Sequence, residues 1–178
     1  MADTRDGGAA SFDELYPALG KMLVASSRME WRLRYLVCWL AGEDQGGWIV
    51  FEGQSVDWLV ASGRAILGEL RYSRRWPDEN SDRIENALAE VQAIAAQRNF
   101  LVHGDWDTKC YSENCKPRLR NLPSDDRVFH VARSRYRKGF EEREVAVTDV
   151  EKLAKRMVDL AAEMDRAKVA ARIAWIGR

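Results

Sequence analysis

The segment RNFLVHG at residues 98–104 holds more potential chemistry than any other part of the chain, because it combines Arg98, Asn99 and one of only two histidines, His103. Histidine exchanges a proton near neutral pH, whereas the guanidinium of arginine stays charged and binds two phosphate oxygens at once. On an α-helix, Asn99 and His103 are four residues apart and share a face, and Arg98 lies beside them. These three polar groups suit a phosphodiester better than most substrates.

The same segment has the features of a helix end. Gly104 follows His103 where a left-handed helix cap is expected, and the C-terminal end of the helix dipole should favour a protonated imidazole. A structural interpretation stands beside the chemical one, because a histidine in this position often only caps terminal carbonyls. An arginine there often only donates a salt bridge. The sequence favours catalysis or phosphate binding and leaves the structural role open.

The pattern R-N-x-x-x-H, with four residues between Arg98 and His103 near a helix end, resembles the signature of the HEPN superfamily. Proteins of this superfamily are small helical domains that usually dimerise, and many are metal-independent endoribonucleases of toxin–antitoxin, phage-defence and CRISPR systems. The resemblance implies catalytic roles for Arg98, Asn99 and His103 only. The polar insertion after the motif departs from the superfamily's layout.

The resemblance also implies a mechanism and partners. His103 would assist attack of the ribose 2′-hydroxyl on phosphorus, Arg98 would stabilise the charged phosphorane, and Asn99 would orient His103 or the phosphate. A homodimer would bring two copies of the motif to face each other across a cleft. RNA is the expected partner, a cognate antitoxin is a possible one, and no cofactor is expected.

Length and composition favour one domain. The chain has 178 residues, of which 46% are hydrophobic, enough for a sizeable core over residues 11–178, after a disordered leader at residues 1–10. We see neither a signal peptide nor an apolar run long enough to span a bilayer, so a cytoplasmic protein without membrane contact is expected. The 28 basic and 28 acidic residues argue against a DNA-coating protein.

Helical periodicity predicts the elements that position the motif. The first helix begins near Asp13 and ends before Gly42, the second uses apolar positions from Val56 to Leu70, and the third runs from before Ile84 to the motif. Thr148-x-x-Glu151 predicts a capping box before a fourth helix that reaches Met164, and Gly46-Gly47 predicts a turn. The expected fold is an all-α bundle of about four main helices with a small β-hairpin insertion.

The insertion covers residues 106–147, where helical periodicity is lost. Short β-branched runs at residues 128–131 and 144–147 predict a hairpin whose loop contains Gly139, residues 106–111 are a candidate for a further strand, and residues 112–126 predict a loop. Arginine alternates in this insertion, so that one face of an extended segment presents several cations to an RNA backbone. The RNA-binding candidates are Arg133, Arg135, Arg137 and Lys138. The alternative is a solvated loop.

Three further alternatives remain open. Cys110 and Cys115, with the two histidines, supply enough ligands for zinc, but their spacing is wider than a zinc knuckle, so no metal site is expected. Glu30 either meets Arg98 from another helix or is a solvated charge, and the second interpretation is favoured. The rival functions are a non-catalytic helical module that binds nucleotide, RNA or a protein, and a purely structural dimer.

Overall fold

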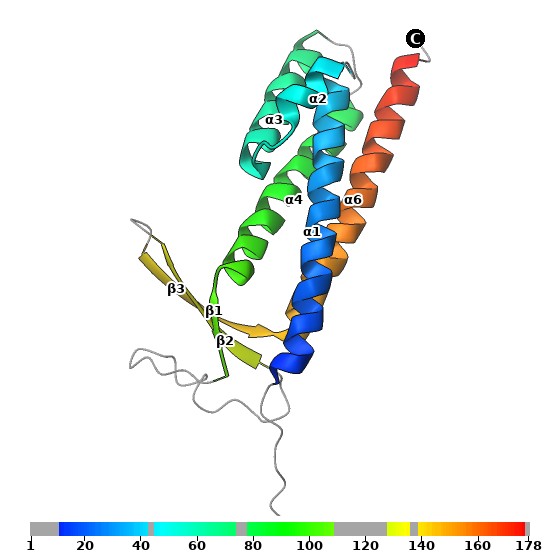
Figure 1. Ribbon diagram of the computed structural model, residues 1–178. Helices are drawn as coiled ribbons and strands as arrows, with labels where there is room; N and C mark the ends of the chain where they lie inside the picture. Colours follow the sequence, from blue (N-terminus) through cyan, green and yellow to red (C-terminus); the bar gives the residue numbers. More distant parts are fainter. Residues whose placement is uncertain (1–10, 43–44, 74–77, 109–127, 136–138, 177–178) are drawn as a thin grey trace, which may run out of the picture.

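The computed structural model describes residues 11–42, 45–73, 78–108, 128–135 and 139–176, and the described part contains five helices and one three-stranded antiparallel sheet. Figure 1 shows the sheet at the end of the bundle where two long helices begin and a third one ends. The elements, in chain order, are α1 (Phe12–Leu40), α2 (Gln45–Phe51), α3 (Val56–Tyr72), α4 (Asp78–Val102), β1 (Asp105–Asp107), β2 (Val128–Arg135), β3 (Gly139–Ala146) and α6 (Val147–Ile176).

The core lies between α1, α4 and α6, and the apolar stripes of these helices explain it. In α1 and α6 the buried residues recur every three or four positions, so each helix turns one continuous face to the other. Alanines continue the buried stripe of α6 beyond Met164, which lets the helix run further than the predicted stripe. The buried residues that span these two helices include Leu15, Met22, Met29, Leu33, Val150, Met157, Leu160, Ala167 and Ala171.

The sheet has strand order β1-β2-β3 and packs one face against the helix ends. Phe129 and Val131 of β2 are fully buried, and Val145 lies opposite Phe129 on the same face. The ring of Phe129 lies 5.2 Å from that of Phe12 at the start of α1 and 5.8 Å from that of Trp106 in β1. The insertion therefore extends the helical core at the end of the bundle that carries the motif.

The mainly helical architecture was predicted correctly, but the predicted Gly46-Gly47 turn is wrong. Both glycines lie inside the short helix α2, which ends in the buried Phe51. Arg34 of α1 donates from Nε to the carbonyl oxygen of Phe51 at 3.2 Å, which satisfies a backbone acceptor at the end of α2. Tertiary contacts thus hold a helix that two glycines disfavour locally.

The start of α6 also differs from the prediction. The helix begins at Val147, so Thr148 lies inside its first turn and does not cap it. Instead, the carboxylate of Asp149 accepts a hydrogen bond from the backbone N–H of Ala146 at 3.3 Å. This is the reciprocal half of a capping box, in which the third helical residue reaches back to the residue before the helix.

The insertion is more regular than predicted. The hairpin is confirmed, but β2 continues to Arg135 and β3 already starts at Gly139, whose positive φ of 83° suits glycine. The second strand ends at Ala146, so Val147, predicted as part of it, instead begins α6. A further strand is present as β1, which pairs with β2, but it spans Asp105–Asp107 and not the predicted residues 106–111, of which 109–111 lie outside the described residues. The predicted leader at residues 1–10 and the loop at residues 112–126 lie outside the described residues. No helix in the described part of the chain is long and apolar enough to cross a membrane.

Candidate functional site

Arg98 lies in the last turns of α4, and three side chains hold its guanidinium. Its Nε donates to Oγ of Ser26 at 2.9 Å, and its Nη1 donates to Oδ1 of Asn99 at 2.8 Å. Its Nη2 forms an ion pair with Oε1 of Glu30. Ser26 in turn donates to the same Glu30 oxygen at 3.0 Å and is itself buried. Glu30 therefore meets Arg98 from α1, and the favoured interpretation of Glu30 as a solvated charge was wrong.

This network fixes the guanidinium without using all of its donors. A guanidinium has five N–H groups, and three of those on Arg98 donate to Ser26, Glu30 and Asn99. The Arg98 side chain keeps 24% of its surface exposed. Two N–H groups therefore remain without an acceptor among the described residues, and they are available to a ligand from solvent.

His103 lies one residue beyond the end of α4 and is exposed. It forms no hydrogen bond or ion pair with any residue that the structure describes. A histidine that only capped the helix would donate to one of its terminal carbonyls, and this one does not. The structure therefore leaves the imidazole of His103 accessible, while Arg98 and Asn99 are joined to each other one turn earlier.

Gly104 is required by packing and not by a left-handed cap. It is absent from the described glycines with positive φ, which are Gly42, Gly53 and Gly139. A Cβ atom added at Gly104 would lie 2.4 Å from Cγ1 of Val131 and 3.0 Å from the carbonyl oxygen of Phe100. The predicted left-handed cap is therefore wrong. A glycine is needed here because the absence of a side chain lets β2 pack directly against the end of α4.

The sheet supplies the caps of α4 that the sequence did not reveal. Nη1 of Arg133 donates to the carbonyl oxygen of Asn99 at 2.6 Å, and Nε1 of Trp106 donates to that of Leu101 at 2.8 Å. Both oxygens lie in the last turn, where a helix leaves its carbonyls without internal partners. The insertion therefore holds the motif in place. The only local indication of these caps in the sequence was Trp106, two residues after Gly104.

The four predicted RNA-binding residues fall into two groups. Arg133 is half-buried and its guanidinium donates to a carbonyl oxygen of α4. The prediction that it belongs to a row of exposed cations is therefore wrong. The backbone of Arg135 belongs to β2. The side chain of Arg135, together with Arg137 and Lys138, lies outside the described residues.

A pocket of about 470 Å³ opens beside Arg98 between α1, α3 and α4. Polar side chains from all three helices line it, and the small side chains of Ala95 and Ala96 leave it space. The polar lining residues are Glu30, Ser55, Asp57, Gln92, Arg98 and Asn99. The motif thus borders a concave polar site, to which Gln92 of the same helix and Asp57, which is far from the motif in sequence, also belong.

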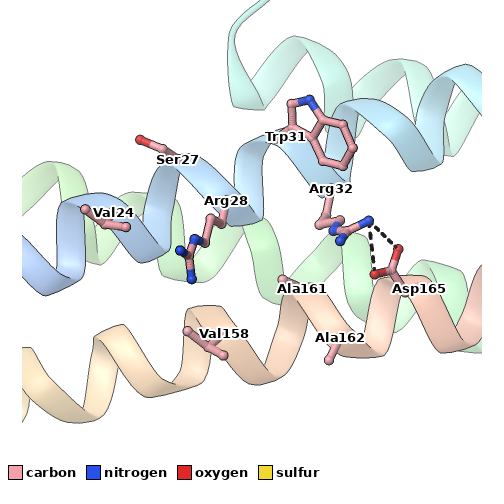
Figure 2. A pocket seen from close by; sticks show the side chains of 9 residues that line it. All are labelled: Val24, Ser27, Arg28, Trp31, Arg32, Val158, Ala161, Ala162 and Asp165. Carbon is pink, nitrogen blue, oxygen red and sulfur yellow. Dashed lines mark hydrogen bonds and ion pairs between the residues drawn. The ribbon is translucent and has the colours of Figure 1, made fainter.

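A larger groove of about 650 Å³ runs between α1 and α6 and is shown in Figure 2. Val24 and Trp31 of α1 and Val158 of α6 give it an apolar lining, and an ion pair at 3.3 Å between Arg32 of α1 and Asp165 of α6 joins the two helices beside it. Arg98, Asn99 and His103 do not line this groove. It is thus a second, mainly apolar concavity, separate from the polar site of the motif.

Cys110 and Cys115 lie outside the described residues, and Cys38 is buried in α1. Among the residues that the structure describes, no group of three or more His, Cys, Asp or Glu side chains is placed to hold a metal ion. His130 lies 3.8 Å from Glu142 within the sheet. It forms no part of the Arg98 site, because it faces the opposite side of β2 from Val131, which packs against Gly104.

Comparison of the chain with family models, curated proteins and solved structures gave no match.

Proposed function

We propose that this protein is a metal-independent endoribonuclease of the HEPN type, and that Arg98, Asn99 and His103 form its catalytic site. One observation carries the proposal: His103 is exposed and without a described partner, directly after a helix whose Arg98 is rigidly held yet keeps two free N–H groups. Metal-free cleavage of a phosphodiester uses proton transfer by a placed side chain and a fixed cation that stabilises the charged phosphorane.

In the proposed reaction, His103 removes the proton of the ribose 2′-hydroxyl as its oxygen attacks phosphorus. The bond between phosphorus and the 5′-oxygen of the next nucleotide breaks, and that oxygen takes up a proton. The products are a 2′,3′-cyclic phosphate and a 5′-hydroxyl. The two free N–H groups of Arg98 bind the phosphorane oxygens, and the Asn99 amide supports Arg98 through the bond from Nη1 to Oδ1.

A homodimer completes this site. One copy of the motif offers one histidine, whereas the reaction needs a base for the 2′-hydroxyl and an acid for the leaving oxygen. Two facing copies supply both groups, and a twofold axis places them across one cleft. We extend the proposal to a cytoplasmic toxin or phage-defence nuclease with a cognate antitoxin. In this proposal Arg135, Arg137 and Lys138 contact the backbone of the RNA substrate.

A second function is favoured by a different observation. Glu30 pairs directly with Arg98 and offsets its charge, so the site has less net attraction for phosphate than a free arginine would have. A non-catalytic module of the same fold, which binds a nucleotide, RNA or a protein, would tolerate such a pair. Cleavage assays separate the two functions.

The test incubates purified protein with structured and unstructured RNAs in the presence of EDTA, and analyses the product ends. We expect cleavage that leaves 2′,3′-cyclic phosphates. His103→Ala should reduce the rate by at least about a hundredfold, since a placed proton-transfer group contributes roughly 10²–10⁴-fold. Gln97→Ala, an exposed substitution on the same helix, is the matched control and should cleave like the wild type.

Two results would contradict the nuclease. The first is absence of cleavage by the wild type on every RNA, and the second is undiminished cleavage by His103→Ala. RNA or nucleotide binding without cleavage would leave the non-catalytic module. Sedimentation at micromolar concentration tests the dimer separately, because a strict monomer would leave the site with a single histidine.

A further inference from the structure

The pocket beside Arg98 contains acceptors and donors that the proposed reaction does not use. Asp57, at the start of α3, is exposed, and its carboxylate has no hydrogen-bond or ion-pair partner among the described residues. Gln92 lines the same pocket from α4. An uncompensated carboxylate repels phosphate, so this part of the pocket suits a neutral group that carries hydrogen-bond donors.

The orientation of the Gln92 amide is fixed by a neighbour. Nη1 of Arg64 donates to Oε1 of Gln92 at 3.0 Å, while Nε of the same arginine is held by Glu85 at 2.8 Å. Rotating the amide by half a turn would place its NH₂ group against the guanidinium, where both groups are donors. The amide oxygen is therefore occupied, and the NH₂ group of Gln92 remains available to donate.

The pocket thus combines a free carboxylate with a free amide NH₂ group. A carboxylate accepts two parallel hydrogen bonds when its partner carries two adjacent donors. Among the four RNA bases only guanine offers that pair, N1–H and the N2 amino group, on its Watson–Crick edge. The other side of the same base presents the acceptors O6 and N7, which an amide NH₂ group matches. Single-stranded bases expose both edges.

We propose that this pocket is a guanine subsite, in which Asp57 accepts from N1–H and N2–H of the base and Gln92 donates to O6 or N7. The proposal rests on the proposed ribonuclease function and names its substrate preference: guanosine at the nucleotide whose 3′-phosphate reaches Arg98. The volume of about 470 Å³ lies within the range of small-molecule sites, about 300–1,000 Å³. The small Ala95 and Ala96 side chains provide room for the base on the α4 side.

The test measures binding of the four nucleoside 3′-monophosphates to the full chain by calorimetry or NMR titration. Guanosine 3′-monophosphate should bind about tenfold to a hundredfold more tightly than the other three, the range expected when a base is read by a bidentate pair. Asp57→Asn replaces one acceptor with a donor and should abolish that preference. Glu69→Gln, which removes an exposed carboxylate of α3 outside the pocket, should retain it.

Two further variants separate base recognition from other effects. Ala96→Leu should block all four nucleotides, because the added side chain enters the pocket from an exposed helical position that tolerates it. His103→Ala should keep the guanine preference, because it removes proton transfer and leaves the pocket intact. Among the four nucleosides without phosphate, guanosine should again bind most tightly. All four should bind more weakly than their 3′-monophosphates, since they lack the phosphate that Arg98 binds.

Equal binding of the four nucleotides by the wild type would overturn the subsite, as would an unchanged preference in a folded Asp57→Asn variant. Cleavage of RNA without preference for guanosine would also overturn it and would leave the proposed nuclease standing. The converse result, selective binding of guanosine 3′-monophosphate by a protein that cleaves no RNA, would remove the nuclease and keep the subsite as that of a guanine-nucleotide-binding module.

Discussion

Replacing Arg98 with alanine is expected to destabilise the fold, because Arg98 links α4 to α1 through Ser26 and Glu30. The Arg98 and Glu30 side chains are 24% and 28% exposed, so the pair lies between a surface and a buried salt bridge. A surface pair contributes about 0–1 kcal/mol, and breaking a buried one costs about 3–5 kcal/mol. Arg98→Ala should therefore lower the free energy of unfolding by about 1.5–3 kcal/mol.

The assay is a double-mutant cycle of Arg98→Ala and Glu30→Ala, followed by urea unfolding and circular dichroism. Each single variant leaves one unpaired charge, whereas the double variant leaves none, so the two losses should not add and the coupling should be about 1 kcal/mol or more. Arg156→Ala is the control, since Arg156 pairs with Glu90 between α6 and α4 while both side chains are about half exposed. Its loss should stay below about 1 kcal/mol.

A cycle in which the Arg98 and Glu30 losses add, or in which Arg98→Ala is as stable as the wild type, would refute this reasoning. Either outcome would mean that the ion pair contributes nothing to the contact between α1 and α4. The network could then no longer be said to hold the guanidinium in a fixed position.

Two other predictions follow from the end of α4. Gly104→Ala should cost about 1–3 kcal/mol through overpacking against Val131, and an unfolding midpoint equal to that of the wild type would show that β2 yields freely. Replacing Arg135, Arg137 and Lys138 together with glutamine should flatten the salt dependence of RNA binding by about 0.7 per lost phosphate contact, and an unchanged slope would return this segment to a solvated loop. Arg133→Gln should instead lower stability, because Arg133 caps α4.

The sequence predicted the elements with strong periodicity and missed those that depend on tertiary contacts. The buried stripes of α1, α4 and α6 were visible because apolar residues recur every three or four positions. The helix α2 was not, because two glycines disfavour it locally and its stability comes from the buried Phe51 and the bond from Arg34. Glycine gave a misleading signal at Gly104 for the same reason, since only the fold shows Val131 beside it.

The candidate site was predicted in part. The motif was recognisable because its residues are close together in the sequence, and in the structure the guanidinium of Arg98 donates a hydrogen bond to the side chain of Asn99. Ser26 and Asp57 were not predicted, because they join the site only through the packing of α1 and α3 on α4, and Gln92 was not predicted although it lies on the same helix as Arg98. A single sequence carries no mark of such pairs. Glu30 was considered as a partner of Arg98, but its place on the edge of an apolar stripe favoured a solvated charge, since most edge carboxylates are solvated.

The double role of Arg98 makes Glu30→Gln the most informative variant of the site. Loss of cleavage in Arg98→Ala would follow equally from a lost phosphate contact and from a disturbed helix pair. Glu30→Gln instead keeps an oxygen acceptor for Ser26 and Arg98 and removes only the negative charge that competes with phosphate. If Arg98 binds phosphate, RNA affinity should rise by about threefold to tenfold, the effect of removing roughly 0.5–1.5 kcal/mol of opposing interaction near a partly exposed guanidinium.

The measurement is the dissociation constant of a single-stranded RNA in a His103→Ala background, where the RNA stays intact. Glu90→Gln is the control, because it neutralises a carboxylate of α4 outside the site, and it should change affinity by less than Glu30→Gln. If Arg98 were only structural, Glu30→Gln would weaken the fold and leave RNA affinity no higher than the Glu90 control does. A gain confined to Glu30→Gln therefore identifies Arg98 as a phosphate ligand, because loss of a purely structural ion pair provides no new attraction for RNA.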